Sequence, residues 1–125
     1  MRTITIGDIR RGDTSGIPLS RIYVIREGDT VLYVGKSKDA VARVEGHLGV
    51  AHYGWNCTGT TLSEYLRTTD SNGFTVELFD RCDVKRSANL AEDDRLFPGE
   101  LDLYVSDLER DLIKKLLPKL NVIGN

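Results

Sequence analysis

Two short segments rich in Ile, Val and Tyr constrain the fold of this chain more than any other feature. The first covers residues 21–27, the second covers residues 30–35, and Gly28-Asp29 lies between them. Segments of this composition, joined by glycine and aspartate, are typical of the two strands of a β-hairpin. The hairpin predicts a sheet at the centre of the fold.

The length of the hairpin loop decides which side chains share a face of that sheet. A two-residue loop would place Tyr23 and Tyr33 on opposite faces, whereas a three-residue loop over residues 27–29 pairs Tyr23 directly with Tyr33. We favour the three-residue loop because it separates both phenols from the aliphatic residues. The residues expected on the other face are Ile22, Val24, Leu32 and Val34.

The rest of the chain predicts an α+β fold, in which a third strand and several helices accompany the hairpin. FTVELF (74–79) has the composition of the third strand, and the alternation over Thr3–Ile6 fits an extra N-terminal edge strand. Residues 10–18 and 49–60 have the composition of loops. Helices are expected from a cap at Ser37 or Asp39 to Leu48, over Thr61–Arg67, and from about Ser106 to Leu117, where Pro118 ends the last one.

Length and composition limit the class of protein. A chain of 125 residues with 40% hydrophobic and 29% charged residues fits one globular domain over residues 1–125. No apolar run approaches the roughly 20 residues that span a bilayer, and the N-terminus lacks the apolar core of a secretion signal. Two cysteines without a metal-binding spacing predict reduced thiols and a cytoplasmic protein without a membrane partner.

One carboxylate breaks the pattern of the last helix. On a helical wheel Glu109 falls in the middle of the apolar half, whereas Arg110 and Asp111 lie on the opposite side. A carboxylate on an apolar face costs several kcal/mol unless it is paired, protonated or bound to a metal. Two interpretations stay open: an ion pair across the core, for instance with Arg43, or a metal ligand or acid–base group in a cleft.

Three further positions between the hairpin and the first long helix suggest binding of an anion. Gly35-Lys36-Ser37 lies between a strand and a helix, where backbone N–H groups and a lysine can approach a phosphate. The nucleotide-binding loop would also need a glycine at position 30, which is Thr30. Arg43 and His47 follow one helical turn apart, an arrangement that is either a solvated surface pair or a phosphate-holding pair.

Together these residues resemble the GIY-YIG nuclease family over about residues 20–122. The resemblance implies a small three-stranded antiparallel sheet flanked by helices, with its core over about residues 20–122 and an N-terminal arm over residues 1–19. The resemblance begins with Ile22-Tyr23 and Tyr33-Val34-Gly35 and continues through Lys36, Arg43 and His47. It ends with Glu109-x-x-Leu112-Ile113, Pro118 and Asn121. Two positions depart from the family name, since Arg21 replaces its first glycine and Val34 replaces its isoleucine.

The resemblance implies a DNA endonuclease that hydrolyses a phosphodiester bond with one divalent cation, Mg²⁺ or Mn²⁺. The implied metal ligand is Glu109, and a single carboxylate suits an ion that keeps most of its water. Tyr23 is implied as the general base, although a free phenol titrates about three pH units too high for that role. The remaining implied residues are Tyr33, Arg43 and His47 at the reacting phosphate and Gly35, Lys36, Ser37 and Asn121 in substrate binding, with Asn121 as a brace.

Two other functions stay open on the sequence. A net charge of −2, with 17 basic and 19 acidic residues, favours a catalytically weak nucleic-acid-binding module that needs a recognition or scaffold protein as its partner. A purely structural domain would use Glu109 in an internal ion pair. RNA as a substrate and the oligomeric state also stay open.

Overall fold

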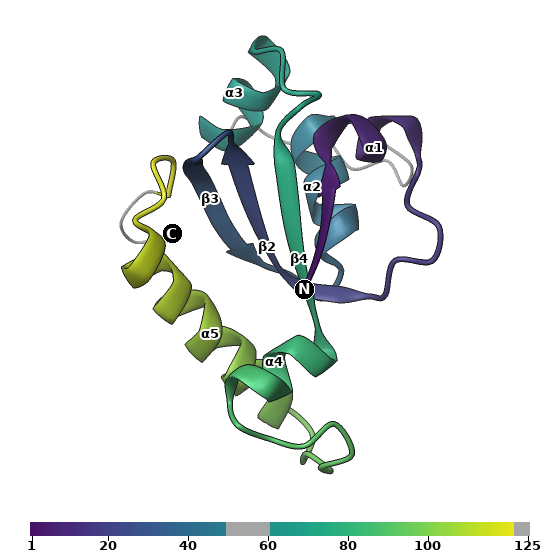
Figure 1. Ribbon diagram of the computed structural model, residues 1–125, viewed down its shortest axis with the longest axis vertical. Coiled ribbons are helices and arrows are strands. Elements are labelled where there is room, and N and C mark those ends of the chain that lie inside the picture. Colours follow the sequence, from purple (N-terminus) through teal and green to yellow (C-terminus); the bar gives the residue numbers. More distant parts are fainter. Residues whose placement is uncertain (50–60, 122–125) are drawn as a thin grey trace.

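The computed structural model describes residues 1–49 and 61–121, and within them a four-stranded antiparallel sheet lies between two groups of helices (Figure 1). The sheet has the order β1-β4-β2-β3, so the predicted N-terminal strand is present and pairs with β4. The α+β prediction is confirmed, with four strands in place of three. The elements are β1 (Arg2–Thr5), α1 (Ile6–Arg11), β2 (Ser20–Glu27), β3 (Thr30–Lys36), α2 (Ala40–Leu48), α3 (Thr61–Thr68), β4 (Thr75–Asp80), α4 (Arg81–Ser87) and α5 (Glu100–Leu116).

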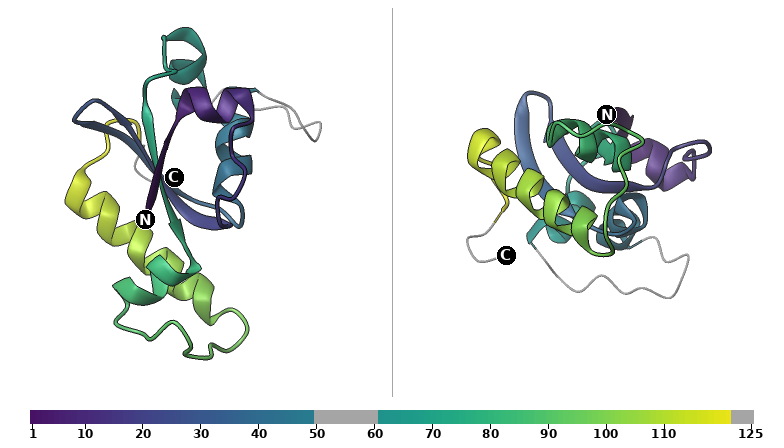
Figure 2. Two further views of the ribbon diagram at one scale, coloured as in Figure 1. Left: turned by 45° about the vertical axis from the view of Figure 1, so that its right-hand side comes forward. Right: turned by 90° about the horizontal axis from the view of Figure 1, so that it is seen from below.

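The helices cover the two faces of the sheet unequally. The helices α1, α2 and α3 cover one face of the sheet, and α4 and α5 cover the other (Figure 2). Their buried side chains belong to two separate core clusters. Among the described residues no helix is long and apolar enough to cross a membrane. The predicted loop over residues 49–60 lies, from residue 50 on, outside the described residues.

The register of the hairpin differs from the prediction. Tyr23 pairs with Gly35, and Tyr33 pairs with Ile25, because the turn contains only the two residues Gly28 and Asp29. A β-bulge then places one extra residue, Leu32, in β3 between the two registers. The prediction that Tyr23 lies opposite Tyr33 is therefore wrong.

The bulge also explains why both phenols still share one face of the sheet. The extra residue reverses the alternation of β3, so Leu32 and Tyr33 both face the cluster that contains Tyr23. The prediction that Leu32 lies on the aliphatic face is wrong, and Val31 takes its place. The aliphatic face of the hairpin consists of Ile22, Val24, Val31 and Val34.

Two helices were not expected from the sequence, and a third begins earlier than expected. Thr5 and Asp8 form a capping box that starts α1, and Asp80 and Asp83 form a second one that starts α4. The helix α5 begins at Glu100, immediately after Gly99, and not near Ser106. In α2 the predicted cap is confirmed, since the Asp39 carboxylate accepts a hydrogen bond from the backbone N–H of Ala42 at 3.1 Å.

Candidate active site

Tyr23 and Gly35 form the base of the candidate site. They are direct partners across β2 and β3, and the Tyr23 side chain is only 1% exposed. A Cβ atom at position 35 would lie 2.4 Å from Cζ and 2.5 Å from Oη of Tyr23, so only glycine leaves room for the ring. Gly35 therefore has a packing role beneath the Tyr23 ring, and its role in binding a phosphate stays a prediction.

A row of hydrogen-bonded polar side chains runs from Tyr23 into the core. Its Oη lies 3.1 Å from Nε2 of His47, and Nδ1 of His47 lies 3.0 Å from Oγ of Ser63 on α3. Burial lowers the pKa of His47 to about 4, and the charge of Arg43 acts in the same direction. His47 is therefore neutral at pH 7, with one ring nitrogen donating and the other accepting.

Ser63 belongs to this row of hydrogen-bonded side chains and was not identified from the sequence. It is fully buried on α3, and its neighbours on the same helix face are Leu62 and Leu66. A serine beside a leucine in a short helix does not by itself indicate a chemical role. The only available hint was its position on the apolar face of a short helix.

Tyr33 lies next to Tyr23, at the outer end of this row of side chains. Its ring stacks on Tyr23 with 5.9 Å between centroids and meets His47 edge-on at 6.0 Å. Burial raises the pKa of Tyr33, the charge of Arg43 opposes that rise, and the charge of Glu109 adds to it. The pKa of Tyr23 is raised more strongly, chiefly by burial. Both phenols are therefore protonated at neutral pH.

Glu109 reaches the site from α5. Its side chain is 22% exposed, and burial raises its pKa, while the charge of Lys36 opposes the rise. Oε1 of Glu109 lies 4.0 Å from Nζ of Lys36. The basic residue that faces Glu109 is therefore Lys36, whereas the sequence suggested Arg43 as a partner for an ion pair. The negative charge of Glu109 also raises the pKa values of Tyr23 and Tyr33.

The cations around the site differ in exposure. Lys36 is half exposed and donates a hydrogen bond to Oγ of Ser106 at 2.8 Å. Arg43 lies on the exposed side of α2, whereas His47, one turn further along the same helix, is buried. The Ser37 hydroxyl is engaged with the backbone of Asp39 at the start of α2, so it organises the strand–helix connection.

Asn121 supports the outer strand of the sheet. Its Oδ1 accepts from the backbone N–H of Val34 and its Nδ2 donates to the Val34 carbonyl, both at 2.8 Å. The backbone N–H groups of Lys119 and Leu120 bond to the carbonyls of Val31 and Leu32. The C-terminal segment 119–121 therefore covers the free edge of β3 and holds Tyr33 in place.

The structure thus brings together side chains that are up to 86 positions apart in the sequence. Tyr23, Tyr33 and His47 form the buried part, and Lys36 and Glu109 form the more exposed part. Comparisons with protein-family models, with curated proteins and with solved structures return no match for this chain. Its function is therefore inferred from the site itself.

The donor set suits a cation that needs few protein ligands. Within residues 1–49 and 61–121 no group of three or more His, Cys, Asp or Glu side chains converges on one point. The raised pKa of Glu109 means that its negative charge is incompletely compensated by Lys36. A hydrated Mg²⁺ or Mn²⁺ fits one such carboxylate, because these ions keep several waters as ligands.

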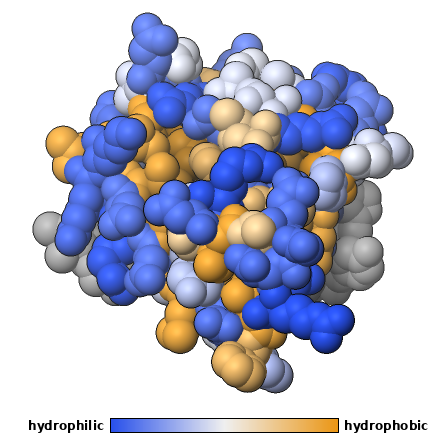
Figure 3. Space-filling view, turned by 60° about the horizontal axis from the view of Figure 1, so that its bottom comes forward, coloured by the Kyte–Doolittle hydropathy of each residue, from blue (hydrophilic) through white to orange (hydrophobic). Residues whose placement is uncertain are grey.

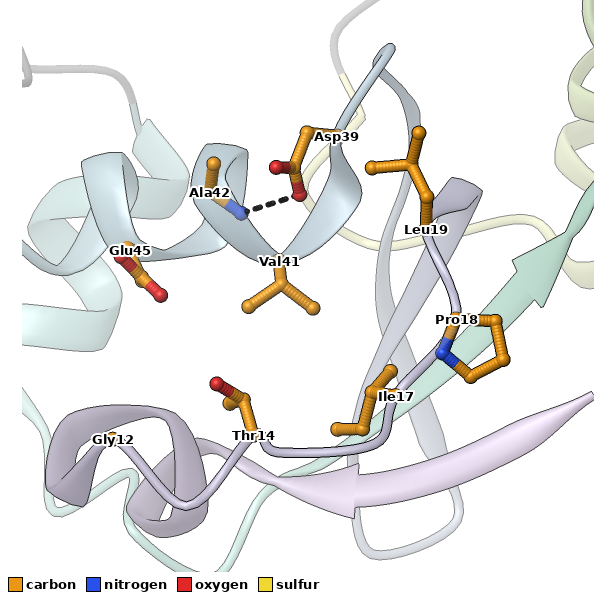
Figure 4. Close-up of a pocket in the computed structure, with 9 residues that line it drawn as sticks. All are labelled: Gly12, Thr14, Ile17, Pro18, Leu19, Asp39, Val41, Ala42 and Glu45. Atoms are coloured by element: carbon orange, nitrogen blue, oxygen red, sulfur yellow. Dashed lines mark hydrogen bonds between the residues drawn. The ribbon is translucent and has the colours of Figure 1, made fainter.

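A cavity lies elsewhere on the molecule, away from the cluster of Tyr23, Tyr33, His47, Lys36 and Glu109. It has a volume of about 540 Å³ and lies between the segment after α1 and the first turns of α2 (Figure 4). Ile17 and Val41 border its apolar part, and Asp39 and Glu45 its acidic part. None of the predicted site residues lines it.

Proposed function

We propose that this chain is a metal-dependent endonuclease domain that hydrolyses a phosphodiester bond of DNA, as its resemblance to the GIY-YIG nucleases implies. The observation that carries this proposal is the position of Glu109, a partly buried carboxylate beside Lys36 and two stacked phenols. Carboxylate, cation and phenol within one cluster supply a metal ligand, a phosphate neutraliser and a group that orients water.

The burial of the two phenols separates their roles. Tyr23 is 1% exposed, whereas Tyr33 is only half-buried, so Tyr33 is the phenol that can contact a phosphate or an attacking water. The raised pKa of Tyr23 opposes its sequence-based assignment as a free general base. In this proposal Tyr23 holds Tyr33 from behind, and neutral His47 fixes Tyr23 through its Nε2.

In this proposal the basic side chains of Arg43 and Lys36 interact with the scissile phosphate. Arg43 places positive charge beside the phenols and Lys36 places it beside Glu109, and both neutralise the charge that develops on the phosphoryl oxygens. When bound at Glu109, a divalent cation adds positive charge at the phosphate and lowers the pKa of a coordinated water. A single ion held largely by water is the arrangement that one carboxylate supports.

Cleavage of DNA by Glu109→Ala tests the proposal directly. Supercoiled, single-stranded and branched DNA are incubated with Mg²⁺ or Mn²⁺, and Asp111→Ala serves as the control because it removes an exposed carboxylate from the same helix. We expect Glu109→Ala to lose about 100-fold or more in rate, and Asp111→Ala to cleave like the wild type. Wild-type cleavage by Glu109→Ala would overturn the proposal.

The stability of the same variant separates a metal site from a structural ion pair. Without metal, removing a desolvated carboxylate should leave the melting temperature unchanged or raise it. A structural pair with Lys36 would instead make Glu109→Ala less stable, by up to about 1 kcal/mol because Lys36 is half exposed.

A nucleic-acid-binding module with weak cleavage is the second candidate. The observation that favours it is the complete burial of Tyr23, since a buried protonated phenol cannot take a proton from water directly. Such a module would bind DNA but show no turnover on any substrate in either metal until a partner protein is added. Multiple turnovers by the isolated chain would exclude it.

A further inference from the structure

A second hollow adjoins the candidate active site at the end of the molecule where β2 begins, β3 ends and α5 begins. Its volume is about 250 Å³. Figure 3 faces the lower end of the molecule in Figure 1, where hydrophilic residues surround patches of hydrophobic surface. The residues that line the hollow are Arg21, Lys36, Ser37, Lys38, Asp102, Val105 and Ser106.

The charges of this hollow are unbalanced. Three cations, Arg21, Lys36 and Lys38, line it together with one carboxylate, Asp102. The hydrogen bond from Arg21 lowers the pKa of Asp102, and the charges of Lys38 and Lys36 lower it further. All three cations therefore act on the same point in space, in a chain whose net charge is −2.

Arg21 is held in one orientation inside the hollow. Its Nε donates to the Ser37 carbonyl at 3.2 Å, one Nη donates to the Asp102 carboxylate, and its side chain is only 15% exposed. A guanidinium fixed in this way offers paired donors to an oxyanion without further loss of side-chain freedom. Arg21 is also one of the two positions at which the sequence departs from the family name.

Lys36 connects the hollow to the proposed active site. It lines the hollow and also lies 4.0 Å from Glu109, so groups bound on its two sides would be close neighbours. We propose that the hollow binds a second phosphate of the strand that carries the scissile phosphate. This inference rests on the proposed nuclease function and adds a subsite to it.

Asp102 occupies part of the space that such a phosphate would use. Its side chain is 55% exposed, and it accepts from Arg21 as a phosphate oxygen would. A bound phosphate therefore competes with Asp102 for the guanidinium and is repelled by its charge. Removing that charge should strengthen binding of the strand, even though it removes an ion pair from the fold.

The test measures affinity for a short single-stranded oligonucleotide in EDTA, where binding does not depend on cleavage. Asp102→Asn is compared with Asp111→Asn, which makes the same charge change on an exposed part of α5. Lys38→Gln is compared with Lys115→Gln, which also lies exposed on α5. Each dissociation constant is measured over a range of salt concentrations by fluorescence anisotropy.

We expect Asp102→Asn to bind the oligonucleotide about fivefold more tightly. We expect Lys38→Gln to bind it about fivefold more weakly, and the dependence of its affinity on salt concentration should have a slope lower by about 0.7. Both controls should change by less than about twofold. Equal effects within each pair would overturn the subsite while leaving the nuclease proposal intact. A wild type that binds no oligonucleotide in EDTA or Mg²⁺ would overturn both. The Lys38 pair decides the question if Asp102→Asn fails to fold.

Discussion

The two faces of the β2–β3 hairpin are built from the same strands but follow different rules. The aliphatic face packs Ile22, Val24 and Val34 against α4 and α5, and this packing requires mainly apolar volume. The other face, the phenol face, carries Tyr23 and Tyr33 against His47, where ring positions and hydrogen bonds must match. We therefore expect the aliphatic face to accept apolar substitutions of similar volume, and the phenol face to lose its arrangement of rings and hydrogen bonds when a residue is replaced.

The largest effect on stability is expected from filling the space under Tyr23. Gly35→Ala places a methyl group 2.4 Å from the ring and should destabilise the fold by about 3 kcal/mol through overpacking. Gly73→Ala is the control, because nothing lies within 4 Å of its added methyl group. Chemical denaturation measures both variants, and equal stabilities would show that the ring does not need the glycine.

A smaller effect is expected from protonation of His47. Its pKa of about 4 in the fold lies below the usual 6.5, so the unfolded chain binds more protons between these values. The contribution is fully present above pH 6.5 and is lost as the pH falls towards 4, with roughly 2 kcal/mol already lost by pH 5. His47→Gln should lack this part of the pH dependence. Parallel profiles for wild type and variant would contradict the burial of a neutral histidine.

The smallest effect is expected at the edge of the sheet. Asn121→Ala removes two hydrogen bonds to the backbone of Val34 and should cost about 1 kcal/mol. Lys119→Ala is the control, since its side chain is exposed and its backbone bond to Val31 stays. Hydrogen exchange of the β3 amides should rise in Asn121→Ala alone, and unchanged exchange would show that the brace is dispensable.

The sequence was sufficient for whatever depends on composition and periodicity. It predicted the hairpin, an α2 cap at Ser37 or Asp39, of which the structure uses Asp39, and the place of Glu109 among the apolar residues of α5. It could not predict the bulge at Leu32, because one extra residue in a strand leaves no compositional mark. It also missed the contact of Ser63 with His47 and the ion pair of Asp102 with Arg21, since both depend on neighbours that are distant in the sequence.

Consecutive residues of β3 allow the most direct test of the division between the two faces. Tyr33→Phe changes the phenol face and Val34→Ala the aliphatic face, and single-turnover DNA cleavage is measured for each at full folding. We predict that Tyr33→Phe loses about 100-fold in rate with little loss of stability. We predict that Val34→Ala loses about 2 kcal/mol of stability but cleaves within a few-fold of wild type. Wild-type cleavage by Tyr33→Phe would contradict the account.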